Sequence, residues 1–190
     1  GSEEITVVYN FYANQLDAGA CYLDEHQLYL NPVHCMFYIV DRMEEEYQLD
    51  MHLPKNYQIA SSMKQDGNIL SVNGYDLLSE SPIICSESLQ HDIYDVDGIV
   101  FHLWFQGECN LDWEKLKIDF TAFTKMQIDK FGSFPVDEYH FLFQITPYKS
   151  YHGVEHTKNT VLLLGPANEI MDKRYEDLLG VCSHELYHTW

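Results

Sequence analysis

Two histidines four residues apart constrain this chain more than any other feature. They belong to the sequence H-E-L-Y-H at residues 184–188. On an α-helix, residues at this spacing differ by about 40° in azimuth, so His184 and His188 can reach one ion, with Glu185 within about 100° of them. Zinc accepts neutral imidazole nitrogens and keeps a position open for water, whose proton a neighbouring carboxylate can accept. The pattern predicts His184 and His188 as Zn²⁺ ligands and Glu185 as a general base.

The residues around this motif favour a helix with one buried face. Apolar side chains recur at helical spacing over residues 174–190, at Leu178, Leu179, Cys182, Leu186 and Trp190. Leu186 points about 200° away from His184, so such a helix would turn its histidines toward a cleft. The alternative is a surface helix with two solvated histidines.

A zinc site needs a third protein ligand, and in H-E-x-x-H peptidases that ligand comes from further along the chain. We therefore expect these 190 residues to be an incomplete catalytic unit without peptidase activity or tight zinc binding. We also expect Leu186 and Trp190 to lack part of their cover.

Charge is distributed unevenly. The net charge is −19, and residues 1–112 hold three basic against 19 acidic residues, whereas residues 113–190 hold eight against 11. This shift predicts a domain boundary near Asn110, with one domain over residues 3–110 and a second over 111–190. An acidic surface repels phosphate and anionic lipid, so nucleic acid and membrane are unfavourable partners. Oligomeric state is not predicted.

The five cysteines are scattered, and none forms a C-x-x-C pair. They are typical of reduced, mostly buried thiols, which favours an intracellular, cytoplasmic protein. A signal peptide missing from this sequence would change that interpretation.

The first domain is expected to be a β-sandwich. Segments rich in β-branched and aromatic residues, bounded by turn residues, predict strands at residues 5–12, 34–40, 47–53 and 99–105. From Asp112 the periodicity becomes helical as far as Phe131, with Asp112 as N-cap and Gly132 as the stop. A strand buried on both faces is predicted at residues 139–145. The fold class is therefore α+β.

The sequence H-G-V-E-H follows at residues 152–156. If this segment is an edge strand, Gly153 and Glu155 face one way, a peptide can pair with its main chain, and Glu155 can hold an α-ammonium group. Glu155 could equally be an ordinary surface carboxylate. His152 and His156 would suit a second zinc ion on a helix, which the glycine and the β-branched residues disfavour.

Three motifs together resemble the glycyl aminopeptidase family of zinc peptidases. They are F-G-S-F-P-V-D-E-Y at residues 131–139, H-G-V-E-H at 152–156 and H-E-L-Y-H-T-W at 184–190. Weaker similarity extends to Y-D-L-L-S-E-S-P at residues 75–82 and to the segment 53–60. Two departures are His152, where the family usually has glycine, and the pair Leu186-Tyr187, which replaces a more aromatic pair.

The resemblance implies a β-sandwich, then the first part of a thermolysin-like catalytic domain, and often a PDZ domain beyond it. It implies removal of N-terminal glycine or alanine from peptides, with His184 and His188 as zinc ligands and Glu185 as base. Gly153 and Glu155 would contact the substrate, and Glu155 would anchor its free amine. The third ligand, a glutamate, and any oxyanion-stabilising tyrosine would follow Trp190.

The sequence thus predicts a zinc aminopeptidase that acts on peptides with a free N-terminus. The alternative is a peptide-binding or chaperone-like module whose metal site has decayed. A glutamate ligand further along the chain would favour the first, and its absence the second.

Overall fold

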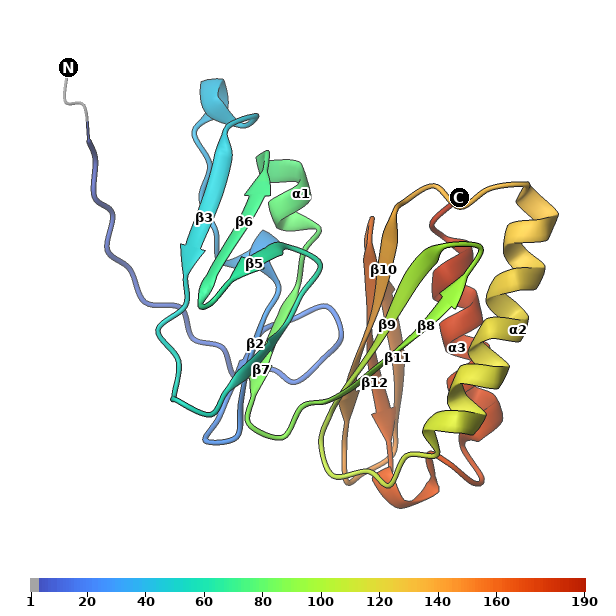
Figure 1. Cartoon of the computed structure of the whole chain (residues 1–190). Helices are drawn as coiled ribbons and strands as arrows, with labels where there is room; N and C mark the ends of the chain where they lie inside the picture. Colours follow the sequence, from blue (N-terminus) through green and yellow to red (C-terminus); the bar gives the residue numbers. More distant parts are fainter. Residues whose placement is uncertain (1–3) are drawn as a thin grey trace.

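A computed structural model describes residues 4–190 and shows sheets and helices stacked in successive layers (Figure 1). A three-stranded sheet lies on a four-stranded sheet, which lies on a five-stranded sheet, and two long helices cover the far face of the last. The predicted α+β class with an N-terminal β-sandwich is confirmed.

The two smaller sheets form the sandwich. The four-stranded sheet contains β1 (Tyr22–Leu23), β2 (Gln27–Leu30), β7 (Ile83–Ser86) and β4 (Gln58–Ala60), in that order. The three-stranded sheet contains β3 (Glu46–Asp50), β6 (Ile69–Asn73) and β5 (Lys64–Asp66). Apolar side chains fill the space between them, together with the short helix α1 (Tyr75–Ser79); they include Ile59, Leu70, Leu78 and Ile83.

Two of the predicted strands are wrong. Residues 5–12 form no strand and leave most of their side chains exposed, with Val8 89% and Tyr12 84% accessible. Residues 34–40 connect two short 3-10 helices, Pro32–His34 and Val40–Arg42, and form no strand. Both segments have strand-like composition, but a strand also needs a partner whose main chain it can pair with, and composition does not report one. The predicted strands at 47–53 and 99–105 correspond to β3 and β9 (Ile99–Gln106).

The five-stranded sheet has the order β11-β12-β10-β9-β8. Its strands are β8 (Gln90–Val96), β9 (Ile99–Gln106), β10 (Glu138–Ile145), β11 (Ser150–Glu155) and β12 (Asn159–Gly165). The central strand β10 runs parallel to both β9 and β12, while the edge strands β8 and β11 are antiparallel to their neighbours. Every residue of β10 after Glu138 is buried, as predicted.

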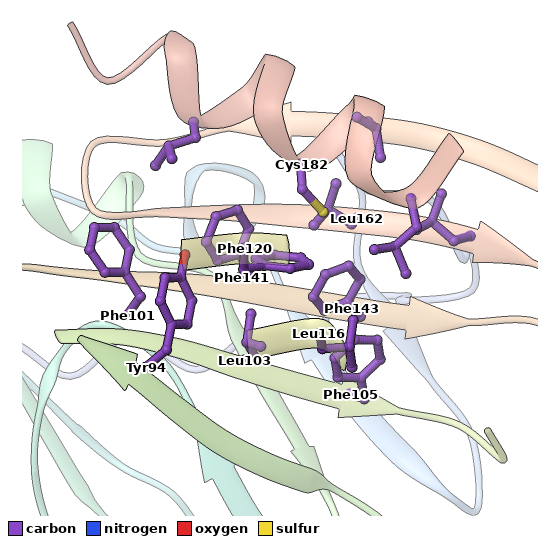
Figure 2. Close-up of a cluster of buried hydrophobic side chains, with 14 of the residues drawn as sticks. Tyr94, Phe101, Leu103, Phe105, Leu116, Phe120, Phe141, Phe143, Leu162 and Cys182 are labelled. Atoms are coloured by element: carbon purple, nitrogen blue, oxygen red, sulfur yellow. The ribbon is translucent and has the colours of Figure 1, made fainter. Parts of the chain in front are cut away.

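Helices α2 (Trp113–Phe131) and α3 (Tyr175–Tyr187) pack on one face of this sheet. Asp112 caps α2 by accepting a hydrogen bond from the Lys115 N–H at 3.0 Å, and Gly132 ends it at φ 86°, both as predicted. Between sheet and helices lies an aromatic core containing Phe101, Phe105, Phe120, Phe141 and Phe143, with Cys182 of α3 above it (Figure 2). The core fixes which face of α3 is buried.

The opposite face of the sheet packs on the sandwich. Leu142, Val161 and Leu163 of β10 and β12 meet apolar side chains of the four-stranded sheet, including Tyr29 and Ile84. β8 and β9 belong to the five-stranded sheet, so the chain passes from the sandwich to this sheet between Ser86 and Gln90. The boundary predicted near Asn110 falls later because the charge shift reports surface composition, whereas sheet membership depends on main-chain pairing.

Among the described residues, no helix is both long and apolar enough to cross a membrane. All five cysteines are free thiols, of which four are buried, as predicted.

Buried Asn159 joins the two units through polar contacts. Its side-chain amide donates to the Ser62 hydroxyl at 2.8 Å and to the Glu80 carbonyl at 3.1 Å. Close by, the His156 ring lies 3.4 Å from the Glu80 carboxylate, which holds the pKa of that carboxyl below its usual value. Asn159 is therefore a specific contact between sandwich and sheet.

We predict that Asn159→Ala lowers the free energy of unfolding by about 1–3 kcal/mol, because two hydrogen bonds from a buried donor to half-buried acceptors are lost. Urea denaturation measures the change. Exposed Asn168 provides the control, and Asn168→Ala should change the stability by less than about 0.5 kcal/mol. Equal effects of the two substitutions would contradict the assignment.

Candidate metal centre

The orientation of α3 exposes the two histidines of the H-E-x-x-H motif. Leu178, Cys182 and Leu186 are fully buried against the aromatic core, while His184 and His188 lie on the accessible side. His188 directly follows the last helical residue and keeps helical dihedral angles, φ −65° and ψ −17°. The predicted helix is therefore present and presents both imidazoles on one face.

The spacing of the two imidazoles suits one zinc ion. The Nε2 atoms of His184 and His188 lie 3.2 Å apart. Two nitrogens that bind a tetrahedral zinc ion at 2.0–2.1 Å are separated by about 3.3 Å. The two side chains thus fit a shared ion with little rearrangement.

Glu185 occupies a buried position between α3 and β11. Its side chain is only 5% exposed although its two histidine neighbours are accessible. A Cβ atom added to Gly153 would lie 2.4 Å from Glu185 Oε1 and 2.7 Å from its Cδ. The carboxyl group therefore rests directly on the main chain of β11, where only glycine leaves room for it.

The electrostatic surroundings of Glu185 suit a general base. Burial raises the pKa of its carboxyl, and the charge of Glu155 raises it further, while the neighbouring histidines oppose that rise. A base works best when its pKa lies near the operating pH. The upward shift brings the pKa of Glu185 closer to neutral pH.

Glu155 lies on the same side of β11 as Gly153. One ligand atom each from Glu155, Glu185 and His188 falls within a 4.8 Å group. β11 is an edge strand, as predicted, with one side unpaired in the sheet. The structure thus brings together all five residues singled out from the sequence, namely Gly153, Glu155, His184, Glu185 and His188.

The other side of β11 faces the sandwich. His152 lies 3.2 Å from the Asp17 carboxylate, and Val154 contacts apolar residues near Ala18 and Tyr29. His152, which departs from the family pattern, is thereby tied to the N-terminal unit. His152 and His156 lie on an extended strand and its end, so the helical spacing that a second zinc site would need is absent.

Polar contacts anchor both ends of the motif. The Gln127 amide of α2 donates to the Ser183 carbonyl and hydroxyl, each at 2.8 Å. Trp190 donates to the Ser133 carbonyl at 2.7 Å and stacks on Phe131 at 4.8 Å. Leu186 is fully buried, so the expectation that it lacks cover is wrong, whereas Trp190 is only half-buried. The loop at residues 133–137, which sequence analysis assigned no partner, supplies part of that cover.

Two further features are not predicted from the sequence. Asp17 meets His152, and no local pattern links residues so far apart. His102, Glu138 and His140 form a group on the sheet face opposite α3. Strand alternation could have placed Glu138 and His140 on one face, but the pairing of β10 with β9 is needed to add His102.

A protein-family model matches the first part of the chain, whereas solved structures match most of it. Residues 1–87 match the Peptidase M61 N-terminal domain. That segment ends where the structure passes from the sandwich to the five-stranded sheet. A comparison with curated protein sequences gave no match.

Solved structures resemble the chain over most of its length. A crystal structure of an aminopeptidase N family protein from Idiomarina loihiensis superposes with a TM-score of 0.84 at 24% identity, over 94% of this chain and 33% of that one. An M1 zinc metallopeptidase from Deinococcus radiodurans superposes with a TM-score of 0.58 at 12% identity, over 95% and 43%. The chain spans less than half the length of either protein. At these identities the likeness shows the fold.

We predict that Gly153→Ala destabilises the chain by about 1–3 kcal/mol, because the new methyl group overlaps the Glu185 carboxyl. Thermal unfolding measures the effect. In a Glu185→Ala background the overlap is gone, so the same substitution should cost much less. Gly180, whose Cβ would meet nothing within 4 Å, is the control, and Gly180→Ala should be neutral or stabilising. An equal cost with and without Glu185 would contradict the contact.

Proposed function

We propose that this chain carries the zinc-binding part of an aminopeptidase active site. His184 and His188 would hold Zn²⁺, and Glu185 would act as general base. The observation that carries the proposal is the 3.2 Å separation of the two Nε2 atoms beside a buried carboxyl group. The match to a peptidase N-terminal domain and the zinc-peptidase fold support it independently.

Bound zinc would supply a Lewis acid that polarises the scissile carbonyl and the attacking water. Glu185 would accept a proton from that water and pass it to the leaving amine. Its contact with β11 holds the carboxyl group in one place, so the base needs little reorganisation. Closely packed positioning of this kind lowers the entropic cost of reaction.

The unpaired side of β11 would bind the substrate as an added strand. Glu155, exposed near the end of that strand, would pair with the substrate's α-ammonium and so limit cleavage to the first residue. The preference for N-terminal glycine or alanine rests on the resemblance of the H-G-V-E-H motif. His152 in place of glycine is the feature of this chain that would modify the fit.

The third zinc ligand is proposed to be a glutamate from outside residues 1–190, as the family resemblance implies. Within the described residues, the carboxylate that could compete for this role is Glu155, which lies in the same group as Glu185 and His188. Substitution of Glu155 separates the two possibilities. The assays below use a longer protein that contains this chain and a complete catalytic domain.

We predict that Glu185→Gln retains zinc and lowers kcat by about 10²–10⁴-fold, because the base is lost while both imidazoles stay. Zinc content by atomic absorption and hydrolysis of a glycyl amide give the two readouts. Glu176→Gln, an exposed change in the first turn of the same helix, is the matched control and should leave both unchanged. Undiminished turnover in Glu185→Gln would remove this residue from the mechanism.

We predict that Glu155→Ala weakens cleavage of substrates with a free amino terminus at least tenfold in kcat/KM, with zinc content unchanged. A hydrogen bond between charged groups is worth about 1.5–3 kcal/mol. N-acetylated peptides, which lack the ammonium group, are the control substrates and should lose no further activity. Loss of zinc from the variant would instead make Glu155 a ligand and overturn the amine-anchor role.

A further inference from the structure

A row of aromatic rings and one carboxylate crosses the sheet face opposite α3. It contains His91 of β8, His102 and Trp104 of β9, and Glu138 and His140 of β10. His102 and His140 occupy paired positions on adjacent parallel strands, and their rings stack at 4.2 Å. His91 in turn stacks on Trp104 at 3.6 Å. None of these residues contributes to the H-E-x-x-H site.

His102 has the hydrogen-bonding pattern of a metal ligand. Its Nδ1 lies 3.0 Å from His91 Nε2. When Nδ1–H donates to His91, Nε2 of His102 is left with a free lone pair. Histidine ligands of metals almost always donate their second ring N–H to an acceptor, usually a carboxylate, a backbone carbonyl or water, which fixes the tautomer and orients the ring; here that acceptor would be His91 Nε2.

His140 is a buried imidazole with an unused nitrogen. The residue is 5% exposed, and its Nε2 has no hydrogen-bond partner. A buried polar atom without a partner is costly, so such an atom calls for an explanation. Metals bind the neutral imidazole through a ring nitrogen, and Nε2 is the nitrogen of His140 that makes no hydrogen bond.

Glu138 supplies a carboxylate next to that nitrogen. Its Oε2 lies 4.0 Å from His140 Nε2, and one ligand atom each from His102, Glu138 and His140 falls within a 4.8 Å group. Glu138 also lines a cleft of about 370 Å³ between the sandwich and the sheet, so solvent reaches its carboxylate. Lys158 nearby is paired with Asp137, so its positive charge is compensated.

We propose that His102, Glu138 and His140 bind a divalent transition-metal ion of the zinc class. Two imidazoles and one carboxylate form a donor set that zinc uses, and they leave one position for water. The ion would link β9 to β10 at the interface with the sandwich. It would satisfy the buried His140 nitrogen that the protein leaves without a partner.

Binding requires two local rearrangements. The His102 and His140 rings are parallel to within 4°, so their lone pairs point along parallel planes and one ring has to turn to share an ion. Trp104 Nε1 donates to His140 Nδ1 at 3.3 Å, and that contact has to open because Nδ1 must hold the proton once Nε2 binds the metal. The fluorescence of Trp104 should therefore report binding.

The test uses Zn²⁺ and the 190-residue chain with His184→Ala and His188→Ala, so the outcome does not depend on the proposed peptidase site. Calorimetric titration should show one zinc ion per chain. In this background, His102→Asn and Glu138→Gln should each weaken binding at least tenfold, and His91→Phe, which removes the partner of a ligand, by about 10–100-fold. His52→Asn is the control, because His52 is an exposed histidine beside Asp50.

Two further measurements make the test specific. Tryptophan emission should change during the titration, and Trp104→Phe should abolish that change while zinc still binds. Circular dichroism verifies that each variant is folded. Absence of zinc binding in the background protein, or binding that is insensitive to both His102→Asn and Glu138→Gln, would overturn the proposal.

Discussion

The burial of α3 against the aromatic face of the five-stranded sheet is the contact on which the candidate metal centre depends. Leu178, Cys182 and Leu186 are fully buried at that interface. Because an α-helix has a fixed periodicity, burying this face determines where His184 and His188 emerge. The Gln127 contact with Ser183 and the Trp190 contact with Ser133 then hold the end of the helix in place. The site is thus a consequence of core packing.

Side chains alternate along the strands, so the five-stranded sheet carries different residues on its two faces. On β10, Tyr139, Phe141 and Phe143 belong to the core beneath the helices, whereas Leu142 contacts the sandwich. On β11, Gly153 lies against Glu185, while His152 and Val154 face the N-terminal unit. The same strands therefore support the H-E-x-x-H centre on one side and the interface between units on the other. His140 is a polar residue on that second side, where its Nδ1 accepts a hydrogen bond from Trp104.

The sequence could predict features that depend on local chemistry. Asp112 and Gly132 mark the ends of α2, and the buried strand at β10 follows from its apolar run. The H-E-x-x-H spacing required a helix, and the structure provides one. By contrast, composition suggested strands at residues 5–12 and 34–40, which pair with no strand in the part of the chain that the structure describes. The charge shift near Asn110 likewise did not coincide with the change of sheet. Long-range pairing decides such features, and a single sequence does not record it.

The candidate site was predictable to the same extent. His184, Glu185 and His188 could be found because one helix carries them, and Gly153 and Glu155 because one family resemblance covers them. The close approach of Gly153 to Glu185 could not be foreseen, since it depends on how α3 lies over β11. The pairing of His102 with His140 has the same character, because it depends on the parallel alignment of β9 and β10. Both contacts join segments that are remote in sequence.

The central claim is that His184 and His188 share one zinc ion beside Glu185. Anomalous diffraction at the zinc edge, from crystals of a protein that contains this chain and a complete catalytic domain, tests it most directly. The account predicts a zinc peak bonded to Nε2 of both histidines at about 2.0–2.1 Å. Glu185 should lie beside that ion without binding it. A zinc-loaded protein with no peak between these two imidazoles would contradict the account.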